Sequence, residues 1–424
     1  MQGFLDFLVD IISVPAVITG VAALVGNIAL KKGFGATVQS SLKAIIGFLV
    51  LGGGAGILIG ALDALGPMFT EGFGITGVVP TNEAIGAVAF AELGQATATI
   101  MVLGFVFNII FAYITPFKYI FLTGHHSLFM AALLAVSLTT LGMSGWIMWL
   151  LGAVLLGLLE VLMPAWAQGV STKVSGTEEW TIGHFNTLGY WLAGVAGRLG
   201  GDSKSTEEIE FPAALSFLKD SMVANGVVMF VVFLVTALAA GGGWVMENLS
   251  GGQHWLVYIL VQALTFAAGV GVVIYGVRLI LAEVIPSFKG IADKVIPAAK
   301  PAFDIPIVFP YAENAVMIGF LSSFVAGLLS MLALGALGLP VIIPGLIPHF
   351  FLGAGTGVIG NAYGGTRGAI LGAFVNGVLI SFGAAFVLPS MASLGFQNTT
   401  FGDADFQWVG IVISLIGRVL GVGG

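Results

Sequence analysis

The chain has 424 residues, of which 58% are hydrophobic and only 8% are charged, and its mean hydropathy is +1.06. This composition excludes an ordinary water-soluble domain, in which about a quarter of the residues are charged. The lack of cysteine excludes disulfide bonds, thiolate metal sites and a phosphocysteine on this chain, and the formal net charge of −7 argues against nucleic acid as a partner.

Apolar stretches long enough to cross a bilayer recur along the whole chain. A crossing helix needs about 20 mostly apolar residues, and roughly eleven such stretches lie between short breaks. The clearest are residues 44–66, 97–117, 143–167, 213–243 and 254–284. The pattern predicts an all-α polytopic membrane protein with about eleven transmembrane helices.

Lysine and arginine are unevenly distributed over the breaks. Residues 1–9, 67–79, 244–253 and 391–405 contain neither, whereas the alternate breaks, among them 171–212, carry basic residues. Because cytoplasmic loops are enriched in lysine and arginine, we expect the N terminus outside and the C terminus in the cytoplasm. The same rule predicts a cytoplasmic-side segment at 171–212 and external loops at 244–253 and 391–405.

The two halves of the chain contain similar motifs in the same order. Residues 54–59 resemble 269–274, and residues 80–84 resemble 310–315. We therefore expect a first inverted repeat at 1–212, a second at 213–405 and a terminal transmembrane helix at 406–424. Inverted repeats with re-entrant segments are typical of secondary transporters, which hold their substrate near the midplane of the membrane.

Few polar side chains interrupt the apolar stretches, and these are the candidates for binding a substrate. His125 and His184 each follow a glycine, and Asp304 lies between Pro301 and Pro306, which is incompatible with a regular helix interior. Glu83 and Glu313 each follow a proline by three residues, in the two repeat-related breaks. The alternative for each is a helix cap or a histidine bonded to a carbonyl. Structural roles are favoured for three further charged residues, Asp63, Glu160 and Arg278.

Several motifs resemble one family over nearly the whole chain. They are Leu122-Thr-Gly-His125, Ile182-Gly-His184, Asp304, Asn314-Ala-Val316 and Ile343-Pro-Gly-Leu-Ile-Pro348. They are similar to the membrane IIC component of the ascorbate-type (ascorbate and galactitol superfamily) phosphotransferase system. This resemblance implies a bacterial cytoplasmic membrane protein with eleven transmembrane segments, interleaved core and scaffold domains, dimerisation through the scaffold and elevator-type movement. It also implies IIA and IIB partner proteins, with the phosphocysteine on IIB.

The resemblance assigns substrate binding to His125, His184 and Asp304. Asn314 is a further candidate because it can donate and accept hydrogen bonds, and Phe129 and Phe185 are candidates because aromatic faces can pack against the C–H surface of a sugar. This chain departs from the ascorbate-specific pattern at four positions. Phe129 and Phe185 stand where ascorbate-specific members have glutamine, Glu83 stands in place of a tyrosine, and Glu313 stands in place of a common proline. Two amides are lost and two carboxylates are gained, which weakens the assignment of ascorbate, an anion, as the substrate.

Two functions are therefore expected. The first is a phosphotransferase-system IIC transporter for ascorbate or a related sugar acid, sugar or polyol. The second is an ion- or proton-coupled secondary transporter of the same fold, with Glu83 and Glu313 as ion sites. Asp304 or a histidine is a candidate base, but no catalytic residue is assigned. The expected partners are a small substrate, lipid, IIA, IIB and a second copy of the chain; no cofactor or metal is expected.

Overall fold

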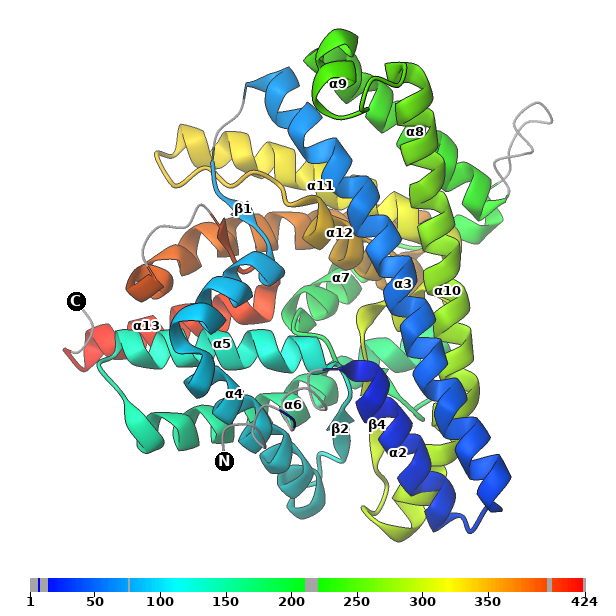
Figure 1. Ribbon diagram of the computed structural model, residues 1–424, viewed down its shortest axis with the longest axis vertical. Helices are drawn as coiled ribbons and strands as arrows, with labels where there is room; N and C mark the ends of the chain where they lie inside the picture. The colour runs from blue at the N-terminus through cyan, green and yellow to red at the C-terminus, as the bar shows by residue number, and fades with distance from the viewer. Residues whose placement is uncertain (1–6, 8–13, 75–76, 210–219, 395–398, 422–424) are drawn as a thin grey trace.

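The computed structural model describes residues 7, 14–74, 77–209, 220–394 and 399–421, and within the helices some side chains, including that of Glu83, lie outside this description. The described chain is mainly helical (Figure 1). Six of its helices are long and apolar enough to cross a membrane, or seven if α8 and α9, which meet at 96°, form one span. The expectation of a helical membrane protein is confirmed.

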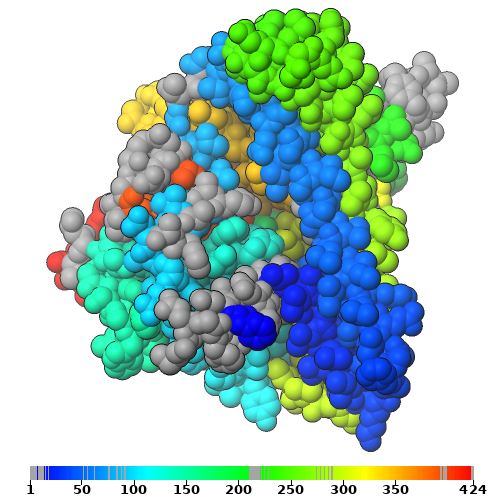
Figure 2. Space-filling view, in the orientation of Figure 1, coloured from blue at the N-terminus to red at the C-terminus, as the bar shows by residue number. Residues whose placement is uncertain are grey.

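One group of helices is built around two very long ones, α3 (Phe34–Phe73) and α10 (Trp255–Lys294). Each has 40 residues, so each spans about 60 Å, roughly twice the thickness of the hydrocarbon core. They lie side by side in Figure 1, and α3 follows one side of the surface in Figure 2. The smaller members of this group are α2 (Pro15–Ala29), α8 (Ser221–Ala240) and α9 (Gly242–Asn248).

The repeat-related glycine motifs lie at the contact between α3 and α10. A Cβ atom on Gly54 would lie 2.7 Å from the backbone nitrogen of Val273, and one on Gly269 would lie 2.9 Å from Cγ of Leu58. Glycine at these two positions therefore allows the close approach of the two helices. The motifs that suggested an internal repeat thus have a direct packing role.

The second group of helices surrounds the region where the strands end. It consists of α4 (Asn82–Ile114), α5 (Gly124–Thr140), α6 (Gly145–Ser175), α7 (Thr187–Leu199), α11 (Glu313–Ala336), α12 (Leu346–Val387) and α13 (Ala404–Val419). Helix α12 is interrupted at Gly364 and Gly365, and Gly365 has a φ of 62°, which glycine adopts without strain. Because α5, α7 and α13 have 17, 13 and 16 residues, they fall short of a full crossing. The expected eleven crossings are thus not all present as separate long helices in the described chain.

Five short strands form two parallel sheets inside the second group. In one sheet, β4 (Lys300–Phe303) lies between β2 (Tyr119–Phe121) and β3 (Thr181–Ile182). In the other, β1 (Val79–Pro80) pairs with β5 (Thr399–Thr400). Three 3-10 helices complete the described elements: η1 (Thr206–Glu208), η3 (Ile305–Tyr311) and η4 (Leu388–Leu394).

Residues 399–405, in the break expected to be an external loop, form β5 and the buried start of α13 rather than an exposed loop. Thr400 and Asp405 are fully buried, and Asp403 is 2% exposed. The strand β5 pairs with β1, at the end of the distant break 67–79, and this pairing draws the segment into the protein. A break without lysine or arginine can therefore be buried as well as external, and the charge pattern does not distinguish the two. Likewise, the segment 171–212 is no simple loop, because it contains buried β3 and all of α7.

Candidate functional site

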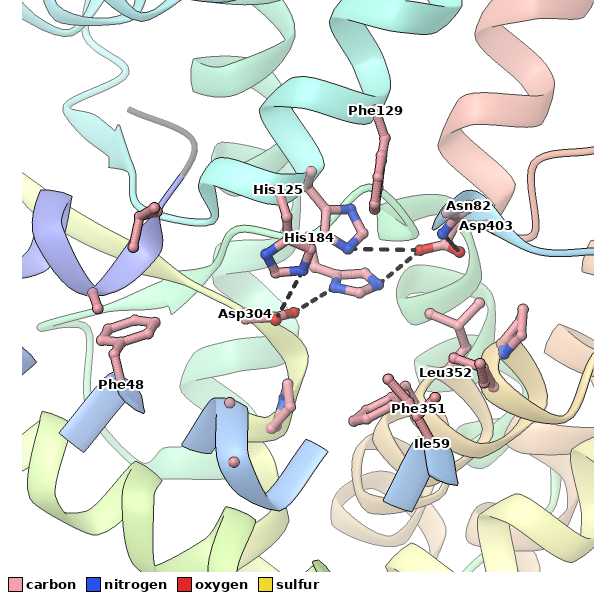
Figure 3. Close-up of a pocket in the computed structure, with 18 of the residues that line it drawn as sticks. Phe48, Ile59, Asn82, His125, Phe129, His184, Asp304, Phe351, Leu352 and Asp403 are labelled. Atoms are coloured by element: carbon pink, nitrogen blue, oxygen red, sulfur yellow. Dashed lines mark hydrogen bonds and ion pairs between the residues drawn. The ribbon is translucent and has the colours of Figure 1, made fainter. Parts of the chain in front are cut away.

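A cavity of about 460 Å³ lies between α3 and the ends of the strands. Figure 3 shows His125, His184, Asp304, Asp403 and Asn82 together on one side of it, and Phe48, Ile59, Phe351 and Leu352 on the other. Among the described residues that line this cavity there is neither a lysine nor an arginine. The cavity therefore has one polar side, rich in imidazole and carboxylate groups, and one apolar side.

The polar side chains follow the carboxyl ends of the five strands. Asp304 comes directly after β4, and His184 follows β3 by two residues. His125 and His126 begin α5 shortly after β2, Asn82 begins α4 after β1, and Asp403 follows β5. Because the strands within each sheet are parallel, their carboxyl ends lie together, and residues far apart in the sequence meet at one place.

His184 is held between the two carboxylates. Its Nδ1 lies 2.6 Å from Oδ1 of Asp304, and its Nε2 lies 2.9 Å from Oδ2 of Asp403. The first contact is a hydrogen bond, and the second is an ion pair. All three side chains are largely buried, with 6%, 14% and 3% exposure for His184, Asp304 and Asp403. A histidine in this position is stabilised as the imidazolium by a carboxylate at each ring nitrogen.

His184 and Asp304 lie in connecting segments, outside the apolar spans. Burial opposes the charge on His184, but its hydrogen bond to Asp304 and its close contacts with the negative charges of Asp304 and Asp403 outweigh it and raise the pKa of His184 to about 9. Burial likewise opposes the charge on Asp304, yet its hydrogen bond to His184 and the charge of that ring lower the pKa of the carboxyl group. The pair is therefore held as imidazolium and carboxylate at neutral pH.

Both carboxylates are fixed by backbone or amide donors as well. The backbone nitrogen of Ile305 donates to Oδ1 of Asp304 at 2.7 Å. The side-chain nitrogen of Asn82 donates to Oδ1 of Asp403 at 2.6 Å, and Oδ1 of Asn82 accepts from the nitrogen of Gly402 at 2.8 Å. Asn82 thus ties the β1 break to the β5 break and sets the position of Asp403.

The two histidines at the start of α5 differ in exposure and in their contacts. His125 is 40% exposed, and its Nε2 lies 3.5 Å from Oδ2 of Asp304. His126 is buried, with its ring stacked on Phe406 at 5.4 Å and its Nδ1 accepting weakly from the nitrogen of Phe185 at 3.4 Å. Since Nδ1 of His126 is an acceptor, its proton is on Nε2, which lies 4.0 Å from Oδ2 of Asp403.

The two phenylalanines that replace glutamines do different things. Phe129 lines the cavity, and its ring packs edge-on to His125 at 6.0 Å. Phe185 is fully buried, stacks on Phe121 at 5.0 Å and is not among the residues that line the cavity. Phe129 is therefore positioned to contact a ligand, whereas Phe185 packs against His126 outside the cavity lining.

The structure places the remaining sequence-predicted residues elsewhere. Glu313 pairs with Arg278 at 2.7 Å, and the side-chain nitrogen of Asn314 donates to the carbonyl of Thr206 at 3.3 Å. Neither residue is among those lining the cavity. Glu83 lies in the first turn of α4, and its side chain is outside the described part of the structure. Glu160, for which the sequence favours a structural or interfacial role, accepts a hydrogen bond from Ser127 at 2.6 Å.

Sequence reasoning missed three residues of the polar side: Asn82, His126 and Asp403. His126 directly follows a residue that was selected, and Asn82 directly precedes Glu83, so adjacency was a usable signal for both. Asp403 lies in Gly402-Asp403-Ala404-Asp405, in a stretch assigned to an external loop. The sequence signal that could have identified Asp403 is the presence of two acidic residues directly before an apolar helix.

The same groups include potential metal ligands. One ligand atom from each of His126, His184 and Asp403 lies within 4.8 Å of the others, as do those of His125, His126 and Asp304. The contacts of His184 at 2.6 and 2.9 Å match direct hydrogen-bonding distances. Ligands around a tetrahedral zinc ion would be spread to about 3.3 Å from one another by metal bonds of about 2.0 Å. As described, the cluster can donate to and accept from the hydroxyl groups of a small ligand.

Comparison with known proteins identifies the family. Residues 10–405 match the family model EIIC-GAT, described as a sugar-specific permease component of the phosphotransferase system. A similar protein is the ascorbate-specific phosphotransferase-system EIIC component of Mycoplasma pneumoniae, 27% identical over an alignment that covers 92% of this chain and 67% of that protein. The cavity and its polar cluster thus lie within the matched region, and the chain belongs to the family of sugar-specific permease components of the phosphotransferase system.

Proposed function

We propose that this chain is a phosphotransferase-system IIC transporter that binds a hydroxylated small molecule in the cavity and delivers it for phosphorylation by a separate IIB protein. The observation that carries the proposal is the His184 ring held between Asp304 and Asp403 beside a cavity of about 460 Å³. Family membership supports a sugar-like substrate, and the ascorbate-specific name of the similar protein supports ascorbate and related compounds as candidates.

The polar side of the cavity suits both binding and phosphoryl transfer. Asp304 and Asp403 can accept hydrogen bonds from substrate hydroxyl groups, and the Nε2 atoms of His125 and His126 face the same carboxylates. During transfer, a substrate hydroxyl must lie in line with the incoming phosphate, and a nearby base assists by accepting its proton. Asp304 or a histidine fills that role in this proposal, and the IIB protein supplies the phosphocysteine, which agrees with the absence of cysteine from this chain.

The proposed movement is of the elevator type. The second group of helices, which holds the strands and the polar side of the cavity, would move against a scaffold that contains α3 and α10. The support for this movement is the position of the cavity, which has Phe48 and Ile59 of α3 on one side and His184 and Asp304 on the other. The scaffold would also form a homodimer. Mass measurement in lipid nanodiscs should give twice the mass of one chain, and a monomeric mass would argue against this part of the proposal.

The proposed membrane is the bacterial cytoplasmic membrane, with the N terminus outside and the C terminus inside. Gln253 and Asp202 are both exposed and lie in breaks predicted to face opposite sides. A cysteine at Gln253 should react with an impermeant thiol reagent in intact cells, and one at Asp202 should react only after permeabilisation. The reverse pattern would invert the topology.

The ion-coupled alternative rests on Glu83 and Glu313. Glu313 makes an ion pair with Arg278 outside the lining of the cavity, which does not favour an ion site there. The two functions are separated by transport into membrane vesicles that contain this chain, with and without purified IIA and IIB proteins and phosphoenolpyruvate. Phosphorylated product that depends on IIB supports the proposal; accumulation of unmodified substrate driven by a proton or sodium gradient would replace it.

A further inference from the structure

The charged side chains of aspartate, lysine and arginine type that line the described cavity are all negative. Its described lining contains two carboxylates, Asp304 and Asp403, and no lysine or arginine. His184 contacts both carboxylates, and one imidazolium can balance only one of them. His126 accepts at Nδ1 from the backbone, which is the arrangement of a neutral ring. The polar side thus places two carboxylates against a single imidazolium that contacts both, and the described lining adds no lysine or arginine.

The carboxylates keep capacity to accept hydrogen bonds. A carboxylate has about four acceptor positions. Asp304 uses Oδ1 for His184 and Ile305, while its Oδ2 has only the 3.5 Å approach of His125. Asp403 uses Oδ1 for Asn82, and its Oδ2 faces the two buried histidines. Hydroxyl groups can donate to these oxygens, whereas the carboxylate of a sugar acid cannot.

The apolar side of the cavity offers no compensation for a second negative charge. Phe48, Ile59, Phe351 and Leu352 line it, and these side chains provide neither a positive charge nor a hydrogen-bond donor. An unpaired charge in such surroundings is strongly disfavoured, whereas the C–H faces of a neutral sugar or polyol pack well against aromatic rings.

We infer that the cavity selects an uncharged sugar or polyol and rejects the corresponding sugar acid, with Asp304 and Asp403 as the paired hydroxyl acceptors. This substrate class rests on the proposed transport function. It departs from the ascorbate named for the similar Mycoplasma protein, because ascorbate is an anion at neutral pH.

Matched ligand pairs test the inference on the purified full-length protein in nanodiscs. The pairs are galactitol with galactonate, xylitol with xylonate, and galactose with galacturonate, because the members of each pair share a carbon skeleton and differ in charge. Thermal shifts and calorimetry at pH 7.5 should show binding of at least one neutral member, at least tenfold tighter than its anionic partner. Tighter binding of an anion, equal binding within a pair, or no binding by any of the six would overturn it.

The variant Asp403→Asn tests the source of the selectivity, and Asp202→Asn, at an exposed position, is the matched control. Removing the charge of Asp403 should reduce the neutral-to-anion affinity ratio at least tenfold, while the control leaves that ratio unchanged. An unchanged ratio in a folded Asp403→Asn protein would overturn the role of Asp403. If that variant does not fold, the wild-type ligand pairs still decide the substrate class.

Failure of the proposed function gives a different result. Ligand binding requires no IIB protein, whereas product formation in vesicles does. Binding of neutral ligands without IIB-dependent phosphorylation would retain the substrate class and remove the phosphotransferase role. Phosphorylation of sugar acids alone would retain that role and remove the substrate class.

Discussion

Two acid–base contacts in this protein are almost equally short and have very different surroundings. His184 lies 2.6 Å from Asp304, and Arg278 lies 2.7 Å from Glu313. The first pair is 6% and 14% exposed, and the second is 61% and 28% exposed. An exposed ion pair contributes about 0–1 kcal/mol, whereas removing one partner of a buried pair costs about 3–5 kcal/mol. Burial, rather than distance, therefore indicates which contact matters.

The largest effect is expected for Asp304→Asn, which keeps the shape of the side chain and removes its charge. Losing a hydrogen bond to a charged group costs about 1.5–3 kcal/mol, which is a loss of affinity of at least about tenfold. Uptake and ligand binding should both fall by this factor or more, while the protein still reaches the membrane as a folded assembly. Asp202→Asn is the control, and wild-type uptake by Asp304→Asn would remove the centre of the site.

A second test titrates His184. Its pKa of about 9 lies above the ordinary value of 6.5, so the folded protein holds a proton that the unfolded chain has released between these values. The resulting stabilisation is fully present below pH 6.5 and is lost as the pH rises through about 9. Ligand binding should follow the same course.

The measurement is the unfolding temperature from about pH 6 to pH 10, for the wild type and for His184→Gln. The wild type should lose more stability than the variant over this range. Parallel curves for the two proteins would show that His184 does not carry the proton.

Asn82→Ala should have a smaller effect, because Asn82 acts through Asp403. The substitution removes the 2.6 Å hydrogen bond to Asp403 and the 2.8 Å bond from Gly402. We expect a several-fold rise in the dissociation constant for a bound ligand. Asn82→Asp keeps the acceptor for Gly402 but places a second carboxylate beside Asp403, so it should weaken binding further. If both variants bind as tightly as the wild type, Asn82 has no part in positioning Asp403.

Local features of the site could be predicted from the sequence, whereas contacts between distant residues could not. Proline on both sides of Asp304 and glycine before His125 and His184 mark local breaks, and local breaks are visible in a single sequence. The pairing of β1 with β5, which brings Asn82 to Asp403 over 321 positions, is not a local property. The helical, membrane-spanning character followed from composition, but the role of Glu313 depended on Arg278, 35 residues away on another helix.

The smallest effect is expected for Glu313→Gln, the counterpart of Asp304→Asn at the exposed contact. Both substitutions remove one carboxylate charge from an ion pair of similar length. Arg278 is 61% exposed and lies near the end of the apolar span Trp255–Val284, and Glu313 begins the span Glu313–Ala336, so the guanidinium group can reach the aqueous interface when the partner charge is lost. We therefore expect uptake to fall by no more than about fivefold, since a surface pair contributes at most about 1 kcal/mol. Arg278→Gln should behave alike, and the double variant should add nothing, because each single change already removes the pair. A loss of uptake in Glu313→Gln as large as that in Asp304→Asn, together with a lost dependence on an ion gradient, would move the functional centre to this contact and revive ion coupling.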